Sequence, residues 1–285
     1  MGETRLPVAI ALGPVRLRVA DTSRAAGWLE RVLGLRELGG ASWGASPATP
    51  LVALREVRGA RAVPRHGRLG LYHYALLLPS RVELGRFILH LESLCEPWGA
   101  SDHLVSEALY LTDPDGLTVE VYADRPREHW TRTGDSLDMA LDPLDRDAIV
   151  AAAGDGRWRG MPEGARMGHL HFFVGDLAHA ERHYVAGIGI DVTTRRLRGA
   201  LFMSAGGYHH HVATNVWAAG APVAGPEDAG LDGWTLGLGS EGEVESLRGR
   251  LDAAGIAYEA DGEAVVVRDP WDIRMHAGAV PAWSP

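Results

Sequence analysis

The sequence predicts an α+β protein built from four similar modules, each with one strand, one helix and about three further strands. Two observations support this prediction. The two halves of the chain repeat, because a strand-like run at 13–21 returns 155 residues later at 168–176, and each run is followed by a helix-like segment. Within each half a second strand and helix begin again, so the chain divides into four units of roughly 50 to 60 residues.

The expected helices begin after residues that can cap them. Asp21 precedes a helix expected over 23–35, and Asp176 precedes one over 177–190. An aspartate oxygen in this position accepts hydrogen bonds from the free N–H groups of the first turn. The second start in each half is again a strand followed by a helix, at 71–78 with 80–94 and at 234–238 with 241–256. Short apolar runs add further strands, at 50–54, 200–203 and 264–267.

The repeat and a polar segment between the halves set the expected boundaries. An Asp-Pro-Asp-Gly turn at 113–116 is matched by Asp-Pro-Trp-Asp at 269–272, 156 residues later. We expect one pair of modules at 8–124, a connector at 125–165 and a second pair of modules at 166–280.

The segment between the halves is rich in Asp, Arg, Pro and Gly, and it is expected to be an ordered connector and not a catalytic domain. Asp142 is expected to cap a short helix that has Pro143 at its first position and continues through Ala153.

Composition argues against several classes of protein. The formal net charge is −9, from 37 acidic and 28 basic residues, which disfavours nucleic acid or an anionic membrane surface as the partner. No apolar run approaches the roughly 20 residues of a membrane-spanning helix, and the first residues are unlike a signal peptide. Cys95 is the only cysteine, so no internal disulfide is expected and a reducing, cytoplasmic setting is predicted.

A carboxylate within an apolar strand is the first sign of a site. Strands are expected at 107–111 and 117–122, joined by the Asp-Pro-Asp-Gly turn. In the second strand Val119 and Val121 would point to one face and Glu120 to the other. A buried charge without a partner is costly, so a metal ion, an arginine or an exposed position must account for Glu120.

The residues before Glu120 follow a wider pattern. It reads His103, five residues, Leu109-Tyr110, two residues, Asp113-Pro114, one residue, Gly116, three residues, Glu120. This pattern resembles the signature of the extradiol ring-cleavage dioxygenases, in which the last glutamate binds ferrous iron and the tyrosine ten residues earlier contacts substrate. Ser101 departs from the signature, which prefers Gly, Asn, Thr, Ile or Val at that position.

The four modules resemble the vicinal-oxygen-chelate superfamily, and the resemblance covers nearly the whole chain. Segments 123–130 (ADRPREHW) and 206–217 (GGYHHHVATNVW) are specifically similar to its catechol 2,3-dioxygenase branch. The resemblance implies two cupped mixed-sheet domains made of paired βαβββ modules. It also implies that metal ligands come from the first and last strands of two paired modules.

The resemblance implies one metal site, formed by the second and third modules. Their strands supply His73, Glu120 and His169. Two imidazoles and one carboxylate on one face of an octahedral ion leave three positions open, as in non-haem ferrous oxygenases. The cup of the first and fourth modules is expected to be free of metal and to have a structural role. Its corresponding residues are Pro14, Thr235 or a neighbour, and His276.

The resemblance also associates three residues with substrate and dioxygen. It implies that His210 is the acid and base, that Tyr110 donates a hydrogen bond and that His103 approaches from a loop. On a regular strand His209 and His211 would point to the face opposite His210, so it stays open which of the three faces the site. His209 or His211 could instead be a further metal ligand or lie at the surface. The alternatives for Tyr110 and His103 are a core tyrosine and a surface histidine.

The activity implied by the resemblance is that of an extradiol dioxygenase that uses Fe(II), with Mn, Zn or Ni as alternatives. Its partners would be a small aromatic diol and dioxygen, in the catabolism of aromatic hydrocarbons.

Two alternatives remain open. A glyoxalase-like isomerase would use the same cup with a redox-inert metal and His211 as a fourth ligand. A resistance protein of this fold would bind a small aromatic molecule without turnover. Neither nucleic acid nor membrane is expected as a partner, and a homo-oligomer is left open.

Overall fold

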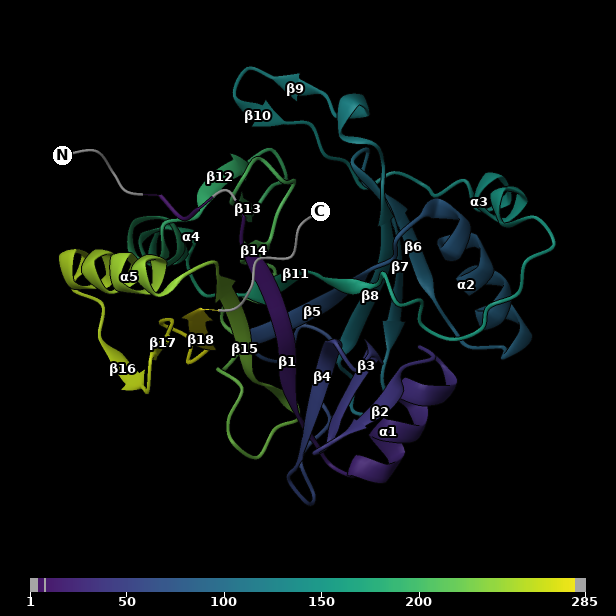
Figure 1. Ribbon diagram of the computed structural model, residues 1–285, viewed down its shortest axis with the longest axis horizontal. Coiled ribbons are helices and arrows are strands. Elements are labelled where there is room, and N and C mark those ends of the chain that lie inside the picture. Colours follow the sequence, from purple (N-terminus) through teal and green to yellow (C-terminus); the bar gives the residue numbers. More distant parts are fainter. Residues whose placement is uncertain (1–4, 8, 280–285) are drawn as a thin grey trace.

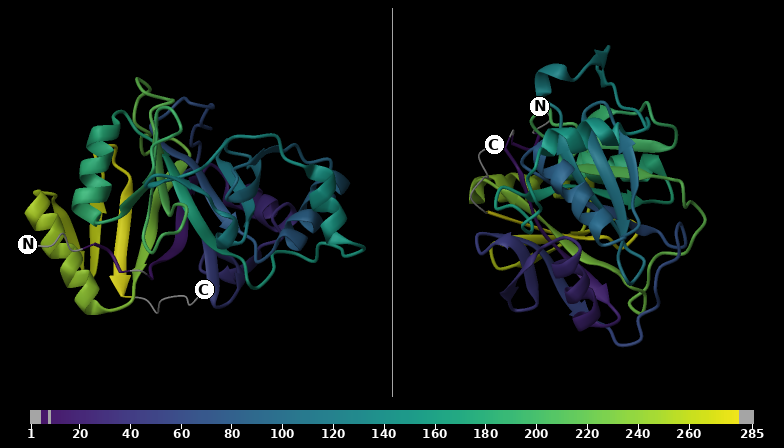
Figure 2. Two further views of the ribbon diagram at one scale, coloured as in Figure 1. Left: turned by 90° about the horizontal axis from the view of Figure 1, so that it is seen from above. Right: turned by 90° about the vertical axis from the view of Figure 1, so that its right-hand side faces the viewer.

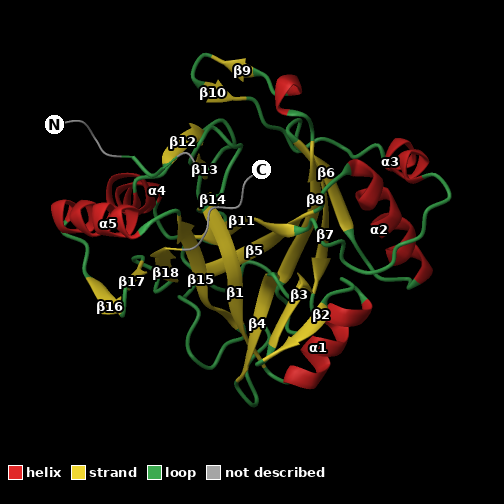
Figure 3. Ribbon diagram, in the orientation of Figure 1, coloured by secondary structure: helices red, strands yellow, loops and turns green. Residues whose placement is uncertain are grey.

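The computed structural model describes residues 5–7 and 9–279, and in this part of the chain all strands except those of one small hairpin belong to two eight-stranded mixed sheets. The predicted α+β class is therefore confirmed. Helices lie on the outside and strands fill the middle of the molecule (Figure 3). None of the helices in the described residues is long and apolar enough to cross a membrane.

The first sheet joins the first and fourth modules through an antiparallel pair at its centre, β1 with β15. From edge to edge its strands are β16 (Tyr258–Asp261), β17 (Ala264–Arg268), β18 (Arg274–Ala279), β15 (Gly230–Leu238), β1 (Ala11–Val19), β4 (Thr49–Glu56), β3 (Ser42–Ser46) and β2 (Arg36–Gly39). The β1 and β15 ribbons run side by side in Figure 1.

The second sheet joins the second and third modules in the same way, through the antiparallel pair β5 and β11. Its strands in order are β12 (Asp191–Thr194), β13 (Ala200–Ser204), β14 (Val212–Asn215), β11 (Arg166–Phe173), β5 (Gly70–Leu77), β8 (Thr118–Asp124), β7 (Ser106–Thr112) and β6 (Gly99–Asp102). The predicted ranges 8–124 and 166–280 each contain two modules that are consecutive in sequence. Each sheet instead combines one module from the first range with one module from the second. Their outer limits, residues 8 and 280, lie outside the described residues.

The four module helices begin within one residue of their predicted starts. They are α1 (Thr22–Arg31), α2 (Arg81–Ser93), α4 (Leu177–Glu181), which continues as the π-helix η2 (Arg182–Ile188), and α5 (Glu241–Ala254). Asp21, Ser80, Asp176 and Ser240 each accept a hydrogen bond from a backbone N–H of the first turn. Seen from above, α4 and α5 lie at one end of the molecule and α1 and α2 at the other (Figure 2).

The connector differs from its prediction. It contains a short 3₁₀ turn η1 (Arg127–His129), a small hairpin of β9 (Arg132–Thr133) and β10 (Ser136–Leu137), and the helix α3 (Arg146–Ala153). The cap of α3 is Asp145 and not Asp142. Asp142 is unavailable because its backbone is extended and exchanges two hydrogen bonds with Asp102 at the end of β6, at 2.8 and 2.9 Å.

Alternation along β8 is as predicted and divides its side chains between two environments. Val119 and Val121 lie in the large core cluster that the helices cover, and both are fully buried. Glu120 and Tyr122 point to the opposite face, where a smaller group of buried side chains surrounds them. This second face is the concave side on which the candidate site lies.

Candidate metal site and its cavity

Three neighbouring strands bring the predicted ligands together. β5 is the middle strand, with β11 antiparallel on one side and β8 parallel on the other. Ala75 of β5 lies opposite His169 on β11 and opposite Glu120 on β8. His73 precedes Ala75 by two residues and therefore points to the same face. Because Ala75 carries only a methyl group, the three longer side chains can meet above it.

One carboxylate oxygen is shared by both imidazoles. Oε2 of Glu120 is 3.1 Å from Nε2 of His73 and 3.1 Å from Nε2 of His169. All three side chains are buried, and one ligand atom from each lies within 4.8 Å of the other two. The second carboxylate oxygen, Oε1, is buried without a hydrogen-bond partner. Two imidazole nitrogens and a carboxylate with an unsatisfied oxygen fit a divalent metal ion.

The protonation states of these residues also suit a cation. Burial would raise the pKa of Glu120, but the adjacent His169 and His73 outweigh burial and hold this pKa well below its ordinary value. Burial lowers the pKa of His73 and the pKa of His169. Near neutral pH the site therefore has one negative carboxylate and two neutral imidazoles, and a neutral imidazole has a lone pair for a metal.

His171 is a further buried histidine beside the site that was not predicted. It follows His169 by two residues on β11 and lies opposite His73. Its Nε2 is 2.9 Å from Nδ2 of Asn215, whose Oδ1 accepts the backbone N–H of Trp217 at 3.0 Å. Since the amide oxygen is engaged, the amide nitrogen donates and Nε2 of His171 accepts. That nitrogen is therefore not available to a metal. The period-two alternation of β11 was the signal that could have found His171.

Tyr110 and His103 lie together at the edge of the same site. The hydroxyl of Tyr110 is 2.7 Å from Nε2 of His103, and Nδ1 of His103 is 2.8 Å from the carbonyl oxygen of Ala140. A carbonyl only accepts, so Nδ1 donates and, in the neutral ring, Nε2 accepts the tyrosine proton. Burial, and after it the charge of Glu120, raises the pKa of Tyr110 well above its ordinary value. His103 comes from the loop between β6 and β7, as expected.

The three consecutive histidines precede β14 and are not part of it. The alternation argument therefore does not apply to them, because the backbone makes a turn there. His210 lines the cavity described below, and its ring centroid is 4.0 Å from that of His169. His209 is fully buried behind it, with Nε2 3.0 Å from Asp124. His211 accepts the backbone N–H of Ala205 at Nδ1. Within the described residues, neither His209 nor His211 belongs to the group of metal-ligand atoms.

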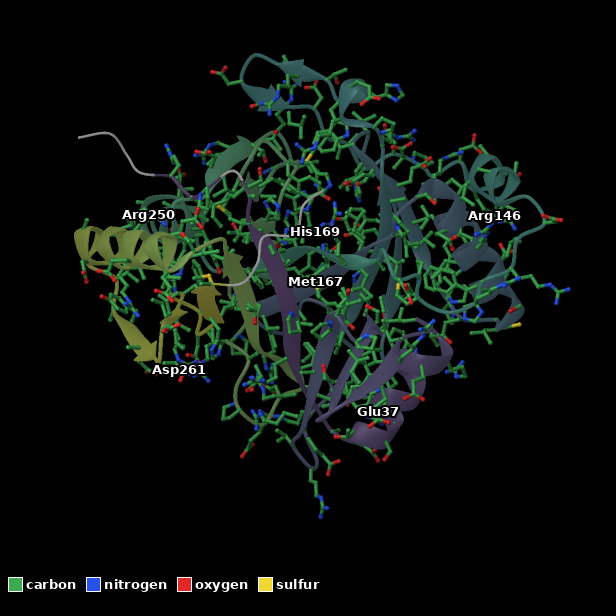
Figure 4. The ribbon with its side chains drawn as sticks, viewed as in Figure 1. Glu37, Arg146, Met167, His169, Arg250 and Asp261 are labelled. Atoms are coloured by element: carbon green, nitrogen blue, oxygen red, sulfur yellow. The ribbon has the colours of Figure 1, made fainter. Side chains whose placement is uncertain are left out.

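A cavity of about 110 Å³ lies over the candidate ligands. A cavity needs roughly 10–15 Å³ to hold one water molecule, so this cavity has room for a small organic molecule. Figure 4 shows His169 near the middle of the molecule. Apart from the histidines, Tyr110 and Glu120, the lining is apolar or aromatic. These side chains are Tyr72, Met139, Leu141, Leu197, Phe202 and Trp217.

The connector contributes to this cavity, which no sequence pattern indicated. Met139 and Leu141 line it, and the intervening residue, Ala140, supplies the carbonyl that holds His103. Leu141 is 60% exposed although it is apolar, which places an apolar side chain at the boundary between cavity and solvent. The segment predicted as a connector thus also forms one wall of the site.

The other sheet has a cup without a comparable set of ligands. His276 lies opposite Thr235, as Glu120 lies opposite Ala75, so Gly233 occupies the place of His73. A cavity of about 140 Å³ there is lined by residues that include Pro14, Thr235 and His276. In the described part of the chain, the only group of metal-ligand atoms is the one in the second sheet. The absence of metal from this cup stays a prediction.

Comparison with known proteins identifies the class to which this fold belongs. No family model matches the chain. A dioxygenase candidate from Bacillus subtilis subsp. subtilis str. 168 superimposes with a TM-score of 0.67 at 12% identity, over 98% of this chain and 87% of that protein. Glyoxalase I from Zea mays superimposes with a TM-score of 0.54 at 12% identity, over 95% and 92%. At this identity the two structures show the fold alone.

A closer relative comes from sequence. Over 223 residues the chain is 39% identical to the catechol-2,3-dioxygenase of Bacillus subtilis (strain 168). The aligned residues make up 77% of this chain and 78% of that protein. The chain therefore belongs to the vicinal-oxygen-chelate superfamily and, within it, to the catechol 2,3-dioxygenase-like branch. The resemblance inferred from the sequence is confirmed.

Proposed function

We propose that this protein is an extradiol dioxygenase that opens the ring of a small catechol-type diol, next to its hydroxyl groups, with dioxygen. His73, His169 and Glu120 would hold a ferrous ion. The observation that carries the proposal is the convergence of these three side chains, with a buried unsatisfied oxygen, at a cavity whose lining is otherwise largely aromatic and apolar. The 39% identity to a protein named as a catechol-2,3-dioxygenase supports the same reaction.

Ferrous iron, when bound, would supply the transfer of electrons from diol to dioxygen, which zinc or magnesium cannot do by redox chemistry. Two imidazoles and one carboxylate would hold the ion and would leave coordination positions for the diol and dioxygen. The carboxylate of Glu120 supplies one negative charge toward the divalent ion, and the two histidines remain neutral donors.

The side chains around the ligands would bind and orient the diol. Aromatic rings such as Tyr72, Phe202 and Trp217 offer faces and edges to a planar substrate, and their apolar surface excludes water from the reacting atoms. His210 lies beside His169 and would accept and return the proton of a diol hydroxyl. Tyr110, held by His103, would direct its hydroxyl oxygen toward the same space.

The test separates this reaction from that of a glyoxalase-like isomerase. The protein is reconstituted anaerobically with Fe(II), Zn(II) or Ni(II), and catechol is added with air while oxygen uptake and visible absorbance are recorded. We expect only the ferrous protein to consume oxygen and form a yellow ring-opened product, with one dioxygen per diol. An iron-loaded protein that takes up no oxygen and forms no yellow product, or equal oxygen uptake with zinc or nickel, would contradict the proposal.

A further inference from the structure

A chain of hydrogen bonds leads from the end of β8 to His210 and lies outside the set of candidate metal ligands. Oδ1 of Asp124 is 3.0 Å from Nε2 of His209. Nδ1 of His209 is 2.7 Å from Nδ1 of His210. His209 is fully buried and His210 is 5% exposed, so the hydrogen bond between the two imidazoles is shielded from bulk water, whereas the side chain of Asp124 is 24% exposed.

The carboxylate fixes the direction of both hydrogen bonds. An ionised carboxylate can only accept, so Nε2 of His209 carries a proton and donates it to Asp124. A neutral imidazole has one donor and one acceptor nitrogen, so Nδ1 of His209 accepts and Nδ1 of His210 donates. Nε2 of His210 is then left with its lone pair. This nitrogen makes no hydrogen bond with any described residue, and the ring lines the cavity.

A second branch ends on the same carboxylate and is arranged consistently. The hydroxyl of Tyr208 donates to Oδ1 of Asp124 at 3.2 Å, and the hydroxyl of Tyr122 is 2.7 Å from that of Tyr208. Since Tyr208 uses its proton on Asp124, Tyr122 donates to Tyr208. Each hydrogen bond in both branches is therefore donated in the direction of Asp124. A carboxylate on which two branches end requires this arrangement, because it can only accept hydrogen bonds.

We propose that Asp124, acting through His209, is a positioning residue that keeps the proton of His210 on Nδ1 and its lone pair on Nε2. This inference rests on the proposed ring cleavage for its role in catalysis. In that role the O–H bond of a diol hydroxyl breaks, its proton moves to Nε2 of His210, and the oxygen keeps the electron pair. The imidazolium that forms stays hydrogen-bonded to His209, two hydrogen bonds from the negative charge of Asp124.

Two substitutions of His209 separate hydrogen-bond direction from simple packing. His209→Gln offers an amide that can donate to Asp124 and accept from His210, so the direction is preserved. His209→Leu fills a similar volume with neither group. Asp124→Leu removes the acceptor that sets the direction. Tyr208→Phe is the control, because it removes one hydrogen bond to Asp124 but lies outside the path to His210 and outside the cavity lining.

The direct readout needs neither iron nor substrate. Long-range ¹H–¹⁵N spectra of the metal-free protein report which ring nitrogen of each histidine carries the proton. We expect the proton of His210 on Nδ1 in the wild type, in His209→Gln and in Tyr208→Phe, and a shift toward Nε2 in Asp124→Leu. A wild-type His210 with its proton on Nε2, or a tautomer that Asp124→Leu leaves unchanged, would overturn the assignment.

Kinetics of the ferrous protein test the consequence for catalysis. We expect kcat to fall on the order of 10–100-fold in Asp124→Leu and His209→Leu, the range found when an outer hydrogen-bond partner is removed, with KM and iron content unchanged. His209→Gln should restore most of kcat. Loss of iron, or an effect on KM alone, would overturn the positioning role. If the tautomer is as expected but the wild type cleaves no diol, the proposed function fails and the hydrogen-bond assignment stands.

Discussion

Glu120 shows how one residue can be identified from its neighbours in sequence and then placed by its neighbours in space. Its position between Val119 and Val121 left a metal ion, an arginine or an exposed position as explanations for the carboxylate. In the structure both candidate partners, His73 and His169, are 3.1 Å from the same oxygen. A negative charge this deeply buried is tolerated because it faces two potential donors and would face a cation when metal binds.

Replacing this charge gives the first prediction. Glu120→Gln keeps the shape of the side chain but removes the negative charge, so we expect metal affinity to fall by more than the roughly 10–100-fold typical of an outer hydrogen-bond partner. Equilibrium dialysis against Fe(II) under anaerobic conditions measures this. Tyr110→Phe is the matched control, because it changes a neighbouring side chain that is not among the candidate ligands, and it should retain the metal. Equal iron binding by wild type and Glu120→Gln would contradict the ligand assignment.

At the scale of residues, sequence predicted what depends on regular strands and did not predict what depends on loops. His73, Glu120 and His169 lie on strands, and their convergence was anticipated from module pairing. The orientation of His210 could not be derived, because it lies in a turn before β14 where period-two alternation fails. The role of Asp124 was also hidden, since it depends on the path of the same turn.

At the scale of elements, Gly168 allows strand β11 to lie close to the side chain of Tyr122 on β8. A Cβ on Gly168 would lie 2.0 Å from the hydroxyl oxygen of Tyr122 and 2.6 Å from its Cζ. Gly168 also sits at an irregularity in the pairing of β11 with β5, between Met167 and His169. The glycine is therefore required by packing and not by a positive φ.

The second prediction follows from this contact. Gly168→Ala should destabilise the protein by about 1–3 kcal/mol, because the added methyl group would displace the fully buried Tyr122, whose hydroxyl is hydrogen-bonded to that of Tyr208. Gly249→Ala is the control, since no atom lies within 4 Å of its added Cβ and it is exposed on α5. That substitution should stabilise by up to about 1 kcal/mol. Urea unfolding measures both, and equal effects would contradict the contact.

The repeated turns also contain matching aspartates. Oδ1 of Asp113 accepts the backbone N–H groups of Asp115 and Leu117, each within 2.9 Å. Oδ1 of Asp269 accepts those of Trp271 and Ile273 in the same way. Burial raises the pKa of Asp113 to about 7 and the pKa of Asp269 to about 6. The two matched turns therefore share a hydrogen-bond geometry, and the raised pKa values of their aspartates follow from burial.

A third prediction concerns pH. Because the pKa of Asp113 is raised on folding, from 3.8 to about 7, the folded state binds the proton more tightly, and the contribution of this group to the free energy of unfolding falls as pH rises from about 4 to about 7. The slope is at most about 1.4 kcal/mol per pH unit. Asp113→Asn retains an acceptor and cannot ionise, so the wild type should lose stability relative to it over this range. Parallel stability curves for the two proteins would refute the prediction.

At the scale of the whole molecule, modules from the two halves of the chain share each sheet. The four units, the caps Asp21 and Asp176 and the α+β class could be predicted, because each rests on local patterns. The contribution of the connector could not, because Met139 and Leu141 reach the cavity through an irregular path. The candidate ligands likewise come from both halves, with His73 and Glu120 before the connector and His169 after it.

Metal binding should therefore stabilise the whole fold, which is the fourth prediction. A metal that binds only the folded state at 100 times its Kd adds about 2.7 kcal/mol to the free energy of unfolding. We expect zinc, used as an air-stable probe, to raise Tm in the wild type and in His276→Ala, where the change lies in the other cup. In His169→Ala the rise should be absent. An undiminished rise in His169→Ala would mean that the metal binds elsewhere.

The most direct test of the account joins metal binding to turnover in one sample. Anaerobic protein is loaded with Fe(II), freed of excess metal, assayed for iron, mixed with catechol and then exposed to air. We predict one iron per chain and a burst of yellow ring-opened product in the wild type, and neither in Glu120→Gln. Product formation that persists in Glu120→Gln, or a fully iron-loaded wild type that leaves catechol and oxygen unconsumed, would contradict the claim that these three side chains form a ring-cleaving centre.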